Sequence, residues 1–232
     1  TLIRAGDLND NGELILAVND DSIAIADLNS TLAENAWQVQ TFTLADVTDI
    51  DWLAPVPGNP NIALATSATE ILLLDLDGQQ VLDRRDRPSE MFRARRSVPH
   101  ILVETLNGDN YDLEVIYYDS EENNLQSLAL PSTRANLGDS LADLTIRQSF
   151  LKAAQASLTL WFDKLENSTW QRSDGFLLRI RTSDGLVEKM VDVPGQSNVA
   201  LAADAYMVSY QSPLGKVAYH SLVDEKTVEI SG

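Results

Sequence analysis

Residues 48–78, TDIDWLAPVPGNPNIALATSATEILLLDLDG, contain the pattern that decides the expected fold. The dipeptide Asp77-Gly78 suits the positive-φ positions of a tight type I′ turn, so the chain is expected to reverse there. The continuous apolar run 71–74 is typical of a strand covered on both faces, which stacked sheets provide. Strands are predicted at 50–53, 61–66 and 70–76. A turn rich in Pro, Gly and Asn separates the first strand from the second, and a short polar turn separates the second from the third.

The same order of strand and acidic turn recurs loosely along the chain. Its copies read SIAIADLNS, EILLLDLDG, LEVIYYDSEEN, LLRIRTSDG and VAYHSLVDEK. One aspartate marks each copy: Asp27, Asp75, Asp119, Asp184 and Asp224. Successive markers are 48, 44, 65 and 40 residues apart. Three of these intervals fit the spacing of roughly 40 to 50 residues that is typical of propeller blades.

We therefore predict an all-β fold, a β-propeller of about five four-stranded antiparallel blades that forms one domain over residues 1–232. The arrangement resembles the broad class of WD40-like and quinoprotein-like propellers. The WD40 signature itself is missing, because Asp51-Trp52 has the reverse order of the closing Trp-Asp pair. Five units are compatible with a closed five-bladed ring and with part of a larger ring.

One segment departs from this pattern. Residues 141–157, LADLTIRQSFLKAAQAS, are rich in helix formers, and several apolar residues lie at nearly helical spacing. A strand here makes a regular blade, whereas a helix makes an insertion that explains the 65-residue interval. The sequence leaves both alternatives open, so at most one substantial helix is expected.

The composition excludes several classes of function. The 35 acidic and 17 basic residues give a net charge of −18, which repels nucleic acid phosphates and anionic lipid, so no nucleic acid partner is expected. No apolar run approaches the ~18 residues needed to span a bilayer, so direct membrane insertion of this segment is not expected. The absence of cysteine excludes disulfides and thiolate sites but leaves periplasmic and cytoplasmic locations open.

The best candidate metal site is GDLNDNGE, where Asp7, Asn9 and Asn11 precede Gly12 at the spacing of a calcium loop's first ligands. It resembles the FG-GAP type of propeller calcium loop. Ile15 stands where a later carboxylate is expected, and an Asn-Gly turn ahead of a strand explains the same residues. Calcium is the one cofactor that the sequence suggests.

Catalytic motifs are missing from the sequence. His100 and His220 lie in or beside apolar strands without paired spacing, and we interpret both as packing residues. No nucleophile elbow, P-loop or dinucleotide fingerprint is present. Among the four tryptophans, core packing is expected for Trp52 and Trp161, whereas the better candidates for an exposed binding platform are Trp37 and Trp170.

The best candidate binding site is a cluster of six of the 17 basic residues: Arg84, Arg85, Arg87, Arg93, Arg95 and Arg96. Arginine suits bidentate recognition of carboxylate or phosphate, so an acidic ligand or an acidic segment of a protein partner is expected to dock here. Strand alternation puts Arg93 and Arg95 on one face and sends Arg84 and Arg85 to opposite faces. The alternative is that the arginines pair with the domain's own carboxylates, including Asp83, Asp86 and Glu90.

These observations predict a non-catalytic interaction or sensory domain. Because the chain begins without methionine or a leader, we expect it to be a soluble portion of a larger bacterial membrane or transport protein. The first alternative is a propeller hydrolase or lyase that acts on a carbohydrate, with carboxylates and a histidine gathered in one central pocket. The second alternative is a calcium-binding, FG-GAP-like adhesion domain.

Overall fold

All regular secondary structure in the described part of the chain is β-strand, which confirms the all-β prediction. The structure is a computed structural model. It describes residues 3–19, 21–28, 38–89, 91–94, 99–107, 110–130, 144–152, 157–165, 172–183, 187–193, 200–201, 207–211, 216–221 and 226–230. No described segment is a helix able to cross a membrane.

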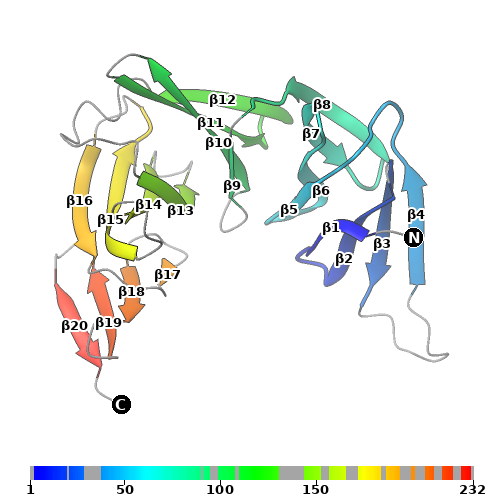
Figure 1. Ribbon diagram of the computed structural model, residues 1–232. Coiled ribbons are helices and arrows are strands. Elements are labelled where there is room, and N and C mark those ends of the chain that lie inside the picture. The colour runs from blue at the N-terminus through cyan, green and yellow to red at the C-terminus, as the bar shows by residue number, and fades with distance from the viewer. Residues whose placement is uncertain are drawn as a thin grey trace. The chain divides into compact units, whose positions relative to one another are not determined.

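The strands form five four-stranded antiparallel sheets in which each strand pairs with its neighbours in the sequence (Figure 1). The first sheet contains β1 (Ile3–Leu8), β2 (Glu13–Val18), β3 (Ser22–Asp27) and β4 (Gln38–Thr43). The second contains β5 (Trp52–Val56), β6 (Asn59–Thr66), β7 (Glu70–Asp75) and β8 (Gln80–Asp86). The third contains β9 (Phe92–Ala94), β10 (His100–Asn107), β11 (Asn110–Asp119) and β12 (Asn124–Leu130).

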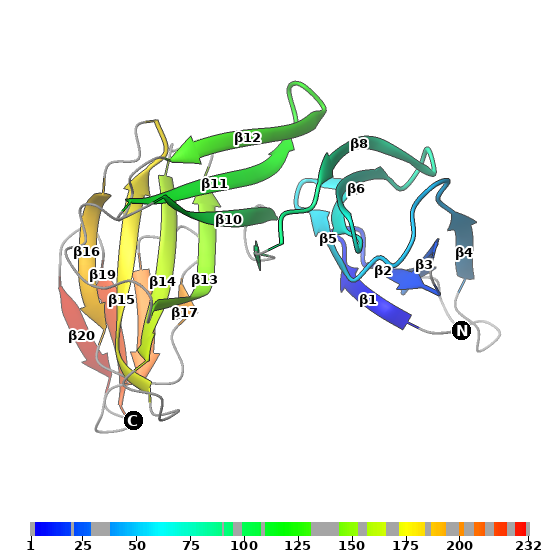
Figure 2. The ribbon, with the colours of Figure 1, turned by 45° about the horizontal axis from the view of Figure 1, so that its top comes forward.

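The remaining two sheets follow the same plan, and Figure 2 shows the long strands of the fourth. The fourth sheet contains β13 (Leu144–Lys152), β14 (Ser157–Leu165), β15 (Arg172–Arg181) and β16 (Val187–Val193). The fifth contains β17 (Ala200–Leu201), β18 (Met207–Gln211), β19 (Val217–Ser221) and β20 (Thr227–Ile230).

The chain forms two compact units. The first comprises Thr1–Val103 and Val115–Ser127, and the second comprises Glu104–Glu114 and Leu128–Gly232. The division falls inside β10 and β11, so the third sheet contributes residues to both units. One domain for residues 1–232 stays a prediction.

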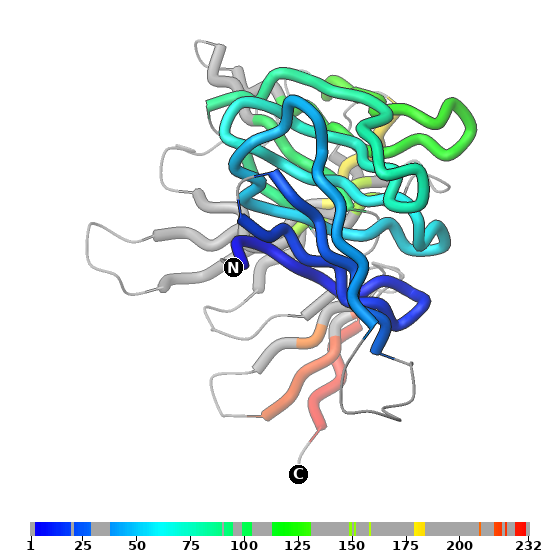
Figure 3. Tube along the Cα trace, turned by 90° about the vertical axis from the view of Figure 1, so that its right-hand side faces the viewer, coloured from blue at the N-terminus to red at the C-terminus, as the bar shows by residue number. Residues whose placement is uncertain are grey.

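The second sheet is apolar on both faces, as the run 71–74 predicted. Leu72 and Leu74 belong to a core cluster shared with the first sheet, whereas Ile71 and Leu73 belong to a cluster shared with the third. All four side chains are fully buried. Alternation along β7 therefore puts a hydrophobic layer on each side of one sheet, and Figure 3 follows the first two sheets from blue to cyan.

The predicted type I′ turn at Asp77-Gly78 is wrong. β7 and β8 are joined by four residues, 76–79, and the positive φ lies at Gln79 (54°). Asp75 Oδ1 accepts a hydrogen bond from the Gly78 N–H at 2.8 Å, so the aspartate side chain caps the turn. A Cβ atom at Gly78 would lie 2.3 Å from Asp75 Oδ2, so this glycine provides room for the capping carboxylate.

Residues 141–157, for which the sequence allowed either a helix or a strand, contain strand β13, Leu144–Lys152. β13 pairs with β14 from Leu144↔Lys164 to Lys152↔Ser157, with one irregularity near Gln148. These backbone pairings override the local helical preference, which is worth only a fraction of a kcal/mol per residue. Residues 141–143 and 153–156 lie outside the described residues.

Candidate functional site

The loop between β1 and β2 is organised by the buried side chain of Asn9. Its Oδ1 accepts the backbone N–H groups of Asn11 at 3.1 Å and Glu13 at 2.9 Å. Its Nδ2 donates to Glu13 Oε2 at 2.8 Å and to the Pro60 carbonyl at 3.2 Å. Gly12 has a φ of 77°, which glycine adopts without strain. The sequence NDNG therefore forms a tight turn.

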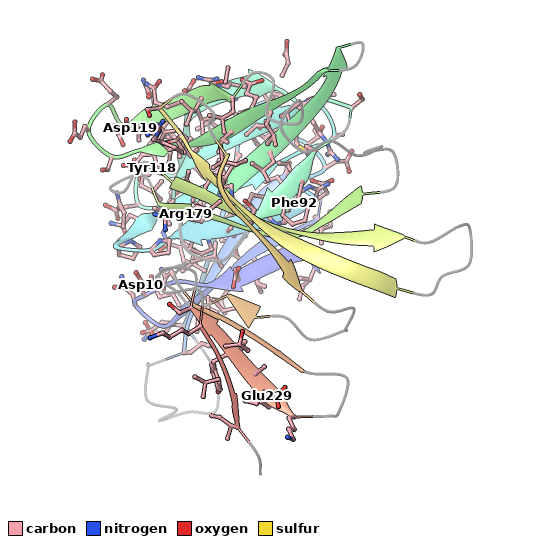
Figure 4. All side chains as sticks on the ribbon, turned by 90° about the vertical axis from the view of Figure 1, so that its left-hand side faces the viewer. Asp10, Phe92, Tyr118, Asp119, Arg179 and Glu229 are labelled. Atoms are coloured by element: carbon pink, nitrogen blue, oxygen red, sulfur yellow. The ribbon has the colours of Figure 1, made fainter. Side chains whose placement is uncertain are left out.

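This loop also attaches the first sheet to the second. Asp10 Oδ2 accepts the Gly58 N–H of the turn between β5 and β6 at 2.6 Å, and Asn9 Nδ2 donates to the Pro60 carbonyl at the start of β6. At the first residue of β6, Asn59 Nδ2 donates to the Tyr118 hydroxyl of the third sheet at 3.2 Å. Asp10 and Tyr118 are labelled in Figure 4. Sequence analysis missed both residues because these bonds join positions 48 to 59 residues apart.

The three predicted calcium ligands differ in position. Asp7 lies within strand β1, opposite Ile15, and not in the loop. Asn9 Oδ1 is occupied by two backbone donors, and Asn11 is exposed. The described residues contain no group of three or more acidic or histidine side chains arranged to hold a metal. Calcium binding stays a prediction, which a calorimetric titration with calcium tests, and a titration without heat would contradict it.

Substitution of Asn9 by alanine is expected to destabilise the fold by about 1–3 kcal/mol, because two backbone N–H groups lose their acceptor. Urea unfolding followed by circular dichroism measures this loss. Asn61→Ala is the control, since Asn61 is exposed, and its expected change is within about 0.5 kcal/mol. Equal losses in the two variants would show that the Asn9 carboxamide does not organise the loop.

The structure describes four of the six arginines in the predicted cluster; Arg95 and Arg96 lie outside the described residues. Arg84 Nη1 lies 3.5 Å from Glu70 Oε2, and its guanidinium also donates to the carbonyls of Ala45 at 3.2 Å and Asp46 at 3.4 Å. It therefore holds the connection between the first and second sheets. Arg85 instead contacts the third sheet, so the two side chains point to opposite faces, as strand alternation predicted.

Arg85 and Asp83 together bind the backbone of one residue in strand β12. Asp83 Oδ2 accepts the Leu125 N–H at 2.9 Å, and Arg85 Nη2 donates to the Leu125 carbonyl at 2.6 Å. These two side chains lie two residues apart on β8, and so extend from the same face of the strand. They satisfy both backbone groups of Leu125, and this pair has a structural role between the second and third sheets.

The other two arginines converge on one carboxylate. Arg87 Nη1 lies 2.9 Å and Arg93 Nη2 lies 3.0 Å from Asp51 Oδ2. Asp51 Oδ1 accepts the Thr66 hydroxyl at 2.6 Å, and Arg87 also donates to the Ser67 carbonyl. We call Asp51, Arg87 and Arg93 the arginine site. All three side chains are partly exposed.

Sequence analysis missed Asp51, because its two arginine partners lie 36 and 42 residues away. The carboxylates considered as internal partners were Asp83, Asp86 and Glu90. Among the described carboxylates, those that form ion pairs with the described arginines of the cluster are Glu70 and Asp51. Glu90 lies outside the described residues. The one available signal was the acidic position directly ahead of the apolar strand that begins at Trp52.

Of the two histidines and four tryptophans, the structure describes the side chains of His100 and Trp52. His100 is fully buried in β10, and Trp52 is 5% exposed, so the packing interpretation of both is confirmed. His220 and Trp161 lie in strands β19 and β14, but their side chains are outside the description. Trp37 and Trp170, the candidates for an exposed platform, are not among the described residues.

A cavity of about 350 Å³ lies along the first sheet, and a smaller one of about 100 Å³ extends from it toward the second sheet. The two share Glu13, Ile25 and Gln40, and the smaller one also contacts Asp77. Their described lining is polar and acidic and contains no histidine.

No known protein-family model matches this sequence, and no curated protein is significantly similar to it.

Proposed function

We propose that this chain is a non-catalytic interaction domain with the architecture of a β-propeller, and that an acidic segment of a protein partner docks on the arginine site. Two features support the architecture. Each sheet is an up-and-down meander of four strands, and apolar clusters join the first sheet to the second and the second to the third. Sheets that stack face to face in sequence order are typical of propeller blades.

The observation that carries the proposed binding role is the convergence of Arg87 and Arg93 on a single Asp51 oxygen. Two guanidinium groups and one carboxylate leave a surplus of one positive charge in a chain whose net charge is −18. Each guanidinium has five N–H donors, and the observed bonds of this site use Nη1 of Arg87 and Nη2 of Arg93. The remaining donors suit a second carboxylate, supplied by the partner.

Arg93→Gln is expected to weaken the binding of a fluorescein-labelled decaglutamate peptide by about tenfold, since one charge-assisted hydrogen bond is lost. Fluorescence anisotropy between about 0.05 and 0.5 M salt measures the affinity, which is expected to fall as salt screens the contact. The matched control is Lys216→Gln, which removes an equally charged, exposed side chain paired with Glu229.

Unchanged binding by Arg93→Gln, or an equal loss in Lys216→Gln, would contradict the proposed site. A large fall in the melting temperature of Arg93→Gln would show that the main role of Arg93 is its internal pairing with Asp51. Retained stability combined with a selective loss of affinity would support the proposal.

A further inference from the structure

The apolar layer between the first and second sheets gives way to polar side chains at one end. Glu13 lies on the same face of β2 as Ile15 and Ala17, which belong to the core cluster shared with the second sheet. Strand pairing places Asp27 opposite Glu13, and Gln38 opposite Asp27. This row of polar side chains therefore lies on the face of the first sheet that is turned toward the second sheet.

The two cavities described above lie along this polar row. The cavity of about 350 Å³ is within the size range of sites that bind small molecules. The cavity of about 100 Å³ continues from it and reaches the second sheet at Asn61, Leu76 and Asp77. All described residues that line the two cavities belong to the first compact unit. We call this continuous space the acidic cleft.

The charges of the acidic cleft occupy two positions. Glu13 and Asp27 line the larger cavity, and Asp77 lines the smaller one. The described lining contains no lysine, arginine or histidine. Ile25 contributes to both cavities, and Leu76 contributes an aliphatic side chain beside Asp77. This arrangement suits a ligand that carries positive groups joined by a methylene chain, because the chain packs on aliphatic side chains while the positive groups meet carboxylates.

The polar groups of the larger cavity suit an ammonium group. Asn9 Nδ2 donates to Glu13 Oε2 at 2.8 Å, which orients the carboxylate. An ionised carboxylate has about four acceptor positions, so Glu13 can accept further donors beside Asn9. The side chains of Gln38 and Gln40 bring amide oxygens to the same cavity. A primary ammonium has three N–H donors and no acceptor, and it can bond to a carboxylate and an amide oxygen together.

We propose that the acidic cleft binds a linear polyamine, with one ammonium group at Glu13 and Asp27 and a second at Asp77. The net charge of −18 attracts such a cation to the chain, and the cleft gives it a defined position. This inference goes beyond the proposed function. The acidic cleft shares no residue with the arginine site, so either proposal can fail while the other holds.

The first test is isothermal titration calorimetry of the full chain with spermidine at about 0.05 M salt, where screening is weak. One spermidine per chain is expected to bind. Glu13→Gln is expected to weaken binding by about tenfold, because a charge-assisted hydrogen bond is lost. Its amide oxygen still accepts from Asn9, so an unchanged melting temperature is expected. Glu122→Gln is the matched control, since it removes the same charge from an exposed turn and is expected to have little effect.

The second test separates the two charged positions. Asp77→Asn changes an exposed residue of the turn between β7 and β8, and it is expected to weaken spermidine binding by about threefold. Pentylamine has a similar chain with a single ammonium group, and its affinity is measured by competition with spermidine. We expect Glu13→Gln to weaken pentylamine binding and Asp77→Asn to leave it unchanged, because a single ammonium occupies the position at Glu13 and Asp27.

Equal losses of spermidine affinity in Glu13→Gln and Glu122→Gln would overturn the proposal, because net charge alone would then account for binding. No binding of spermidine by the natural chain, or equal effects of Asp77→Asn on spermidine and pentylamine, would also overturn it. Glu13-dependent binding of a decalysine peptide without binding of spermidine would replace the polyamine by a basic segment of a protein. Decaglutamate binding is expected to be unchanged in Glu13→Gln, which keeps this test separate from that of the arginine site.

Discussion

Replacement of Trp52 by alanine is expected to lower the free energy of unfolding by about 3–5 kcal/mol. Trp52 is 5% exposed and belongs to the cluster between the second and third sheets, which also contains Leu64, Leu73 and Ile101. Truncation removes the largest side chain of that layer and leaves a cavity, which the surrounding strands fill only in part. Urea unfolding followed by circular dichroism measures the loss.

Trp52→Phe is the graded control for this prediction. Phenylalanine keeps an aromatic ring in the layer, so its cost is expected to be clearly smaller than that of alanine. Leu28→Ala is the surface control, because Leu28 is 40% exposed and lies outside both core clusters of the described residues. A loss below about 1 kcal/mol for Trp52→Ala would contradict its role in the core.

Leu72→Ala is expected to lower the free energy of unfolding by about 2–5 kcal/mol. Leu72 is fully buried on the opposite face of the second sheet, in the cluster shared with the first sheet. The substitution therefore tests a different interface from Trp52→Ala. The same urea experiment measures it, and hydrogen exchange of the strand amides shows which sheets lose protection.

The graded control for Leu72 is Val81→Ala, because Val81 is partly buried against the same cluster. Its expected loss is about 1 kcal/mol, between those of Leu72→Ala and an exposed position. If Leu72→Ala and Val81→Ala cost the same, the layer between the first two sheets would not be the close-packed core that the structure shows.

The sequence by itself determined the class of fold. Strand-forming runs such as 71–74 are local, and a run that is apolar at every position requires cover on both faces, whatever the rest of the chain does. The recurrence of that run with acidic turns predicted five units of about four strands, and the structure contains five four-stranded antiparallel sheets. The burial of Trp52 and His100 was predicted because both lie in or beside apolar strands, and both are buried in the structure.

Local signals failed where a local preference met a tertiary constraint. Residues 144–152 contain good helix formers, yet β13 pairs along its length with β14, and the many hydrogen bonds of that ladder outweigh a small intrinsic preference. At Asp77-Gly78 the dipeptide suits a two-residue turn, but the Asp75 carboxylate caps a four-residue turn and moves the left-handed residue to Gln79. In both places the local sequence was compatible with more than one conformation.

Only the tertiary structure decided the partners of the polar side chains. Asn9 is part of a turn in the sequence, and the fold adds its bond to Pro60, 51 residues away. Arg85 is separated from Leu125 by 40 residues, and Arg87 and Arg93 are separated from Asp51 by 36 and 42. A charged side chain can pair with any opposite charge that the fold brings near, and periodicity carries no information about which strand ends become neighbours. The arginine site therefore exists only once the second and third sheets have stacked.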